Sequence, residues 1–400
     1  MRFVLFFLVF FAIVGGGCYY VGRRIIAPAH LPAPWVQIAW IALMLLPVLS
    51  ILPIILRING LENPVVDYLS WVGYVGLGFL SLLATGVIIR DLFLLGGKAW
   101  TWAANTFRGS SLEPDPERRR LLLYGSNMVI LGAAASLTGY GLYEARRRPE
   151  IRPVDVTMPN LPSEFDGFRI AQITDIHVGP TVKRDWVEKI IRATDSLNAD
   201  MVVFTGDFVD GTVPYLRNDT EPMKELNAPY GHYFVTGNHE YYSGVLSWLK
   251  EMERLQWDTL MNEHRIIERN GAKLVLAGVT DYTAGGFYPD QASDPMKAVA
   301  GAPDNVTRIL LAHQPKSVFA AAQAGIDLQL SGHTHGGQFF PWDNLARLAQ
   351  PYISGLHHHD EKTWIYTSRG TGYWGPPVRI GQPSEITLVT LRCADCRTSA

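Results

Sequence analysis

Four long apolar stretches without a charged side chain constrain the fold of this chain most strongly. They cover residues 3–22, 35–56, 68–89 and 121–143. About 20 apolar residues are enough to cross the hydrocarbon core of a bilayer as a helix. One such stretch is also typical of a removable signal peptide or a buried core helix, but four together favour a membrane anchor. The sequence therefore predicts four transmembrane helices.

The remainder of the chain has the composition of a different kind of domain. With 400 residues and 48% hydrophobic side chains, the chain is too long and too apolar for one uniform soluble protein. Only His30 of the 11 histidines lies within the first 150 residues, so the imidazoles follow the apolar region. No basic stripe stands out in the later part, which argues against a nucleic-acid partner. We expect the anchor to come first and the chemistry to follow it.

The expected domain organisation has four parts. Residues 1–145 form the four-helix transmembrane anchor, 146–166 a linker, 167–392 a catalytic domain and 393–400 a C-terminal tail. The linker assignment rests on a polar stretch punctuated by prolines, in which neither a helical nor a strand period is visible.

Short apolar runs after the linker predict an α/β domain. The runs are rich in Val, Ile and Leu and read as buried strands. They lie at residues 168–173, 201–204, 233–235, 274–277, 308–312, 328–330, 364–367 and 386–391. Helical patterns lie between several of them, at 184–197, 245–261 and 316–324, and this alternation is typical of α/β architecture.

Metal-binding side chains follow five of these predicted strands. The strand ends lead into Asp175 and His177, into Asp207 and Asp210, into Asn238, His239 and Glu240, into His313, and into His333 and His335. Each fragment alone is typical of a turn or of a hydrogen-bonded structural histidine. Because the carboxyl ends of strands line the site crevice in α/β sheets, we expect all five to meet in one place. Together they favour a metal site.

The residue types suggest how two cations would be shared. Two divalent ions need a bridging carboxylate with nitrogen or oxygen donors on either side, and Asp207 suits the bridge. We expect Asp175, His177 and His335 to complete one ion, and Asn238, His313 and His333 to complete the other. Without a thiolate in the set, Mn, Fe or Zn fit better than soft metals.

The order of these motifs resembles the calcineurin-like metallophosphoesterase family over about residues 167–392. The resemblance implies a β-sandwich flanked by helices, a dinuclear site with the ligands given above, and His239 as the residue that protonates the leaving oxygen or holds the phosphate. Gly336-Gly337-Gln338 and the run 368–377 are similar to a membrane-linked bacterial subgroup. Glu240 stands where many members have Asp, which bears on the orientation of neighbouring ligands.

The expected function is hydrolysis of a phosphate ester by a metal-bound hydroxide. A membrane-anchored phosphodiesterase or pyrophosphatase acting on a lipid-linked or envelope phosphate fits the anchor, with the lipid bilayer and the phosphate ester as partners. A phosphomonoesterase or phosphoprotein phosphatase acting on soluble substrates would carry the same motifs. The third alternative is a non-catalytic membrane binding module.

Several residues have a structural interpretation beside a functional one. Arg369 either binds phosphate or forms an ordinary ion pair, and Asp210 either holds a ligand histidine or caps a turn. Asp281 also follows a strand and stays unassigned. Cys393 and Cys396 are half a zinc site at most, and an unpaired tail is the simpler expectation.

The membrane side of the catalytic domain is predicted from charge. If both termini are outside, the cytoplasmic loops carry slightly more Lys and Arg than the outer ones. Arg118 to Arg120 before an apolar stretch look like a twin-arginine export signal, although a basic membrane-edge anchor has the same appearance. Arg146 to Arg148 favour the opposite orientation. We expect an extracytoplasmic catalytic domain.

Overall fold

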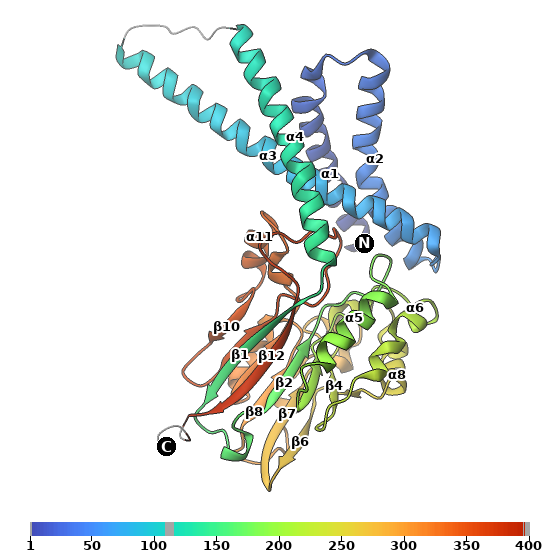
Figure 1. Cartoon of the computed structure of the whole chain (residues 1–400), viewed down its shortest axis with the longest axis vertical. Coiled ribbons are helices and arrows are strands. Elements are labelled where there is room, and N and C mark those ends of the chain that lie inside the picture. Colours follow the sequence, from blue (N-terminus) through green and yellow to red (C-terminus); the bar gives the residue numbers. More distant parts are fainter. Residues whose placement is uncertain (1, 109–115, 395, 397–400) are drawn as a thin grey trace. The chain divides into compact units, whose positions relative to one another are not determined.

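The computed structural model describes residues 2–108, 116–394 and 396 (Figure 1). The chain divides into two compact units. One contains Met1–Tyr143 with Pro376–Val378, and the other contains Glu144–Gly375 with Arg379–Ala400. The predicted division into an anchor (1–145), a linker (146–166), a catalytic domain (167–392) and a tail (393–400) stays a prediction.

The first unit is built from long helices. They are α1 (Arg2–Ile25), α2 (Ala33–Ile58), α3 (Pro64–Arg108) and α4 (Pro116–Arg146). Among the described residues, three helical segments are long and apolar enough to cross a membrane: Ala33–Ile58, Pro64–Phe107 and Arg120–Arg146. The expected first span, residues 3–22, lies in α1, where several side chains fall outside the described residues. The predicted span at residues 3–22 therefore stays a prediction, whereas the other three predicted spans lie in the segments just given.

Helix α3 is longer than the sequence pattern indicates. The apolar stretch ends at Ile89, but the helix runs on for a total of 45 residues through Arg90, Asp91 and Lys98. About 20 residues are enough for one bilayer crossing. The charge-free stretch therefore marks the apolar part of α3 and misses its helical continuation, because charged residues such as Arg and Lys are also good helix formers.

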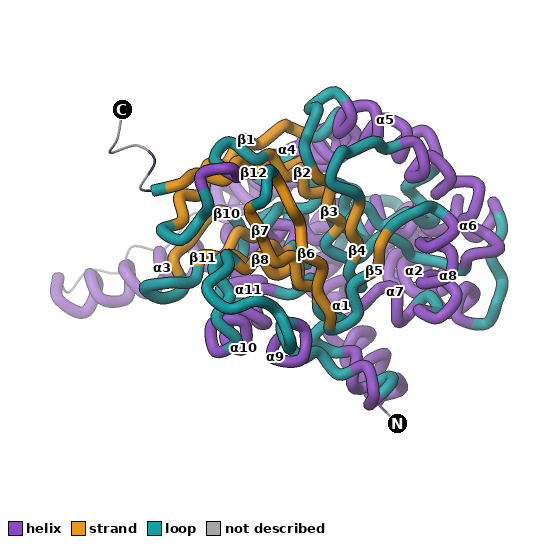
Figure 2. Tube along the Cα trace, turned by 90° about the horizontal axis from the view of Figure 1, so that it is seen from below, coloured by secondary structure: helices purple, strands orange, loops and turns teal. Residues whose placement is uncertain are grey.

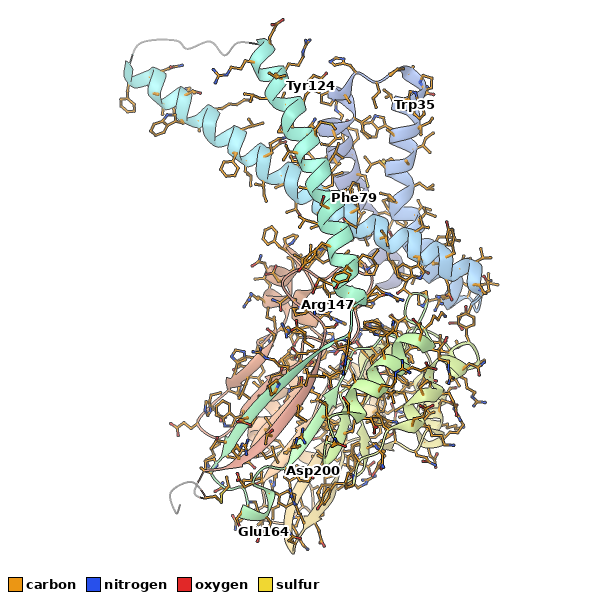
Figure 3. All side chains as sticks on the ribbon, in the orientation of Figure 1. Trp35, Phe79, Tyr124, Arg147, Glu164 and Asp200 are labelled. Carbon is orange, nitrogen blue, oxygen red and sulfur yellow. A yellow bond between two sulfur atoms is a disulfide. The ribbon has the colours of Figure 1, made fainter. Side chains whose placement is uncertain are left out.

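The expected linker contains a strand, which corrects the sequence-based interpretation. Strand β1 (Glu150–Met158) pairs in parallel with β12 (Glu385–Cys393) over nine residues. The strand lies at the edge of its sheet, where a proline is tolerated and outward residues stay polar. Arg147, labelled in Figure 3, pairs with Glu144 of α4 and with Glu150 of β1 at 2.7 and 2.6 Å.

The second unit is a sandwich of two mixed six-stranded sheets. The first has the strand order β1-β12-β2-β3-β4-β5, and the second has the order β10-β11-β9-β8-β7-β6. The strands of the first sheet not yet given are β2 (Arg169–Ile173), β3 (Met201–Phe204), β4 (His232–Phe234) and β5 (Asp258–Thr259). Those of the second are β6 (Glu263–Arg269), β7 (Ala272–Gly278), β8 (Arg308–Leu311), β9 (Leu328–Ser331), β10 (Gly355–His358) and β11 (Trp364–Thr367).

Apolar side chains between and outside the sheets hold the sandwich together. Ile170, Val203 and Leu330 belong to the buried cluster between the two sheets. Trp186 and Trp248 belong to a second cluster, which covers the outer face of the first sheet. Because β2 and β3 are buried on both faces, they read in the sequence as continuous apolar runs.

Helices cover the sheets on their outer faces, as Figure 2 shows. Helices α5 (Arg184–Asp195), α6 (Val213–Thr220) and α8 (Val245–Arg254) lie on one side of the strands. Helices α9 (Pro295–Ala298) and α10 (Val318–Gln323) lie on another. The sequence predicts eight strands in this unit and the structure contains all of them, so the α/β sandwich is confirmed.

Candidate metal centre

The predicted ligands lie on short loops that follow the parallel strands. Asp175 and His177 follow β2, Asp207 follows β3, His313 follows β8, and His333 and His335 follow β9. Asn238 begins the short helix α7 (Asn238–Tyr242) just after β4. All seven side chains are buried or nearly so. The carboxyl ends of the strands therefore bring together residues that are far apart along the chain.

One group of donors consists of Asp175, His177 and His335, all buried. The Nε2 atoms of His177 and His335 lie 3.0 Å apart, and His335 Nε2 lies 3.5 Å from Asp175 Oδ1. Two nitrogens that bind one cation at about 2.1 Å and at a right angle are about 3 Å apart. The group therefore has the spacing of ligands around one ion.

A second group consists of Asp207, His313 and His333. The Nε2 atom of His313 lies 3.0 Å from Asp207 Oδ2 and 3.1 Å from His333 Nδ1. Asp207 Oδ2 also lies 3.8 Å from His177 Nε2 of the first group. Asp207 is thus placed between the two groups, where a bridging carboxylate would have to be.

Two further observations fit bound cations at these groups. The Oδ1 atom of Asn238 is buried and has no hydrogen-bond partner among the described residues, which is costly unless another ligand satisfies it. His313 Nδ1 lies 2.8 Å from the carbonyl of Thr205, so Nδ1 carries the proton and donates it. Nε2 is then the ring nitrogen that a cation would bind, in exchange for the proton that the neighbouring Asp207 carboxylate favours there.

His239 and Asp210 form a pair beside these groups. Asp210 Oδ1 lies 2.5 Å from His239 Nδ1 and 3.2 Å from His177 Nδ1, so one carboxylate orients both rings. The Nε2 atom of His239 lies 3.9 Å from Asp207 Oδ2. The structure therefore favours the interpretation of Asp210 as a residue that orients histidines over the interpretation as a turn cap.

The comparisons with known proteins agree with this geometry. Residues 168–337 match the family model described as calcineurin-like phosphoesterase. A protein of Danio rerio, named as a transmembrane protein with metallophosphoesterase domain, is 36% identical over 328 residues, covering 80% of this chain and 74% of that protein. The chain belongs to the calcineurin-like metallophosphoesterase family. It is therefore a metal-dependent phosphoester hydrolase with an N-terminal helical region.

Other members of the family are similar over most of the chain. A Bos taurus protein of the same name is 36% identical over 336 residues, covering 81% of this chain and 74% of that protein. An uncharacterized metallophosphoesterase of Helicobacter pylori strain J99 is 38% identical over 280 residues, covering 69% and 73%. Among solved structures, a dimetal phosphatase of Danio rerio aligns with 55% of this chain and 91% of that chain at a TM-score of 0.32 and 11% identity.

Glu240 holds together the two loops that carry Asp207 and Asn238. One carboxylate oxygen accepts hydrogen bonds from the backbone N–H groups of Asp207 and Gly237, at 3.0 and 2.6 Å. The other accepts from Phe208 at 2.7 Å. The glutamate in this metallophosphoesterase thus connects the two loops although many family members have Asp at this position.

Backbone strain is concentrated at the site. Five residues with a positive φ are predicted ligands, namely Asp175, His177, Asp207, His333 and His335. Such conformations cost on the order of 1–3 kcal/mol each and persist only where the surroundings enforce them. The backbone of Gly332 also lies very close to the Asp175 side chain, since a Cβ at Gly332 would lie 2.1 Å from Asp175 Oδ2. Only glycine fits there.

Buried charges shift the pKa values of the acidic ligands in opposite directions. Burial raises the pKa of Asp175, and the charge of Asp207 raises it further, although His313 opposes both. Burial also acts to raise the pKa of Asp207, but the positive charges of His313 and His239 outweigh it and lower this pKa well below its ordinary value.

The pKa values of His313 and His333 are also shifted in opposite directions. Burial acts to lower the pKa of His313, but Asp207 overcomes this and raises it to about 10. Burial and the charge of His313 lower the pKa of His333 to about 3. The carboxylates of this pocket thus require nearby positive charge, which divalent cations would also supply.

The sequence interpretation missed Arg379, a buried guanidinium behind His335. It donates hydrogen bonds to the carbonyls of Gly372, Arg369 and His335. Arg379 belongs to the segment of the chain that connects β11 to β12, and no local motif in the sequence marks it. Its proximity to a ligand histidine depends entirely on how distant loops pack.

The structure also assigns the residues that sequence left open. Arg369 Nε lies 2.5 Å from Glu385 Oε2, so the ion-pair interpretation holds, and a role in substrate binding stays a prediction. Buried Asp281 accepts hydrogen bonds from Thr283 and Gln314. Cys393 and Cys396 form a disulfide, which corrects the expectation of an unpaired tail. The spacing of residues along the sequence does not show whether an arginine forms an ion pair or two cysteines form a disulfide.

Proposed function

We propose that this metallophosphoesterase is a membrane-anchored phosphodiesterase or pyrophosphatase that acts on a lipid-linked or envelope phosphate. The observation that carries the proposal is the placement of Asp207 between two His/Asp groups. Two divalent ions, Mn, Fe or Zn, would be held by the seven predicted ligands. When bound, such a pair lowers the pKa of a coordinated water and neutralises phosphate oxygens.

The chain's own residues then orient the ester and supply the proton. Asp210 holds the Nδ1 side of the His239 ring, so His239 Nε2 is free to face the leaving oxygen of a bound ester. Trp374 and Tyr242 pack against the same ring, with centroids 5.7 and 5.2 Å away. These aromatic groups restrict the ring to one orientation.

The proposed reaction is tested by comparing two chromogenic esters. The purified full chain with Mn²⁺ should hydrolyse bis-nitrophenyl phosphate faster than mono-nitrophenyl phosphate, and chelation of the metal should abolish both activities. Faster turnover of the monoester would favour the phosphomonoesterase or phosphoprotein phosphatase alternative. If neither ester is hydrolysed with any divalent metal, the non-catalytic binding module becomes the better interpretation.

We also propose that the catalytic unit is extracytoplasmic. The Cys393–Cys396 disulfide supports this, because disulfides persist mainly in oxidising compartments. In intact cells, a membrane-impermeant maleimide should label these cysteines only after an impermeant reductant has been added. The double variant Cys393→Ser/Cys396→Ser is the matched control and should stay unlabelled. Labelling that needs cell lysis and no reductant would place the unit in the cytoplasm.

A further inference from the structure

Helix α11 (Trp342–Ala349) presents apolar side chains to solvent. None of its eight residues is buried. Leu345 and Leu348 are 51% and 85% exposed, and the preceding Phe340 is 52% exposed. Single exposed apolar residues are normal on soluble proteins, but a contiguous set of large ones marks a surface that contacts a partner or a membrane.

The apolar residues share one side of the helix. At 100° per residue, Trp342, Leu345, Leu348 and Ala349 fall on one side, whereas Asp343, Asn344 and Arg347 fall on the other. A helix with a polar and an apolar side of this kind lies in the plane of a membrane interface, with its apolar side among the acyl chains.

A groove beside α11 adds positive charge to this surface. It has a volume of about 420 Å³, and Arg347 and Leu348 of α11 line it together with Lys316 and Phe319. Within the described part of the chain, neither Lys316 nor Arg347 takes part in an ion pair. Phe319 is 55% exposed. Two unpaired cations beside apolar side chains fit the phosphates of anionic lipids.

The helix is joined tightly to the metal centre. The short 3₁₀ turn His335–Gly337 carries a predicted ligand at its start and Gly337, with a φ of 79°, at its end. A Cβ at Gly337 would lie 2.2 Å from the Cα of Asp343, so the turn packs directly against the backbone of α11. A surface that binds α11 is thereby brought next to the loop of His335.

We propose that Phe340 and the apolar side of α11 insert into the interface of an anionic bilayer, where Lys316 and the long side chain of Arg347, which reaches back from the polar side of the helix, contact lipid phosphates. Because α4 ends at Arg146 and β1 begins at Glu150, this unit cannot diffuse away from a bilayer that α4 spans. Such a tether gives the bilayer a high effective concentration. The inference rests on the proposed membrane anchoring and is independent of the proposed reaction.

Depth-dependent quenching tests the insertion. The variant Leu348→Cys of the full chain is labelled with a polarity-sensitive fluorophore and placed in nanodiscs that contain phosphatidylglycerol and brominated acyl chains. Asn344→Cys, on the polar side, is the matched control. Labelling is specific because Cys18 is buried and the other two cysteines form a disulfide. We expect a blue shift and bromine quenching at position 348 only.

Other results would overturn the proposal. Equal water exposure of both labels would show that α11 stays in solvent, and a blue shift at position 348 without bromine quenching would indicate a protein partner or a second copy of the chain. Hydrolysis of bis-nitrophenyl phosphate by both variants at the wild-type rate reports correct folding. If no variant hydrolyses the ester, the proposed reaction fails while the quenching result still decides insertion.

The charge requirement is tested separately. Quenching at position 348 should increase with the fraction of phosphatidylglycerol. In the background Lys316→Gln/Arg347→Gln, the ratio of inserted to free α11 should fall about 25-fold, because each basic side chain near an anionic surface contributes about fivefold. Quenching that is independent of lipid charge in the unmodified background would overturn the assignment of the two cations.

Discussion

Asp207→Asn is expected to remove nearly all phosphoesterase turnover together with part of the bound metal. The change keeps the size of the side chain but removes the negative charge from the position between the two His/Asp groups. Changes in residues that only orient metal ligands already cost about 10–100-fold, so losing a shared ligand should cost more than about 100-fold. Metal content per chain and turnover of bis-nitrophenyl phosphate are the measurements.

Asp200→Asn is the matched control for this variant. Asp200 lies at the opposite end of β3, where its carboxylate accepts a hydrogen bond from the backbone of Arg169 at 2.7 Å (Figure 3). An asparagine keeps an oxygen acceptor there, so metal content and turnover should match those of the unmodified chain. If Asp207→Asn retained both full turnover and two ions, the bridging role would be wrong.

His239→Ala is expected to slow hydrolysis most for esters with poor leaving groups. A general acid contributes about 10²–10⁴-fold, and an alkoxide needs this proton far more than a nitrophenolate does. We therefore expect a loss of that size with an alkyl phosphodiester and a much smaller loss with bis-nitrophenyl phosphate. Steady-state turnover of both esters measures the difference.

The outcome for the two esters separates the roles of His239. Equal losses with both would contradict proton donation and favour a role in holding the phosphate. His264→Ala is a suitable control, because its ring bonds the carbonyl of Ala298 at 2.7 Å and belongs to none of the metal-binding groups found among the described residues. That variant should leave the ratio of the two rates unchanged.

Much of the candidate site is visible in the sequence because its ligands follow buried strands directly. A buried strand such as Met201–Phe204 is a continuous apolar run, and the residues that end it are short, polar and rich in glycine. Periodicity is therefore enough to place each ligand at a strand end. The strands that the sequence missed are β1, β5, β6 and β10, which lie at or near sheet edges and carry fewer buried apolar residues.

By itself, the sequence determined where three apolar helical segments, eight of the twelve strands and the seven predicted ligands lie along the chain, because local hydrophobic patterns report burial and strand ends. Only the tertiary structure decided which histidine nitrogens converge, that Asp210 orients two rings, that Arg369 pairs with Glu385 and that Arg379 lies behind His335. These contacts join residues that are far apart along the chain. Their formation depends on how the loops pack, which no local pattern encodes.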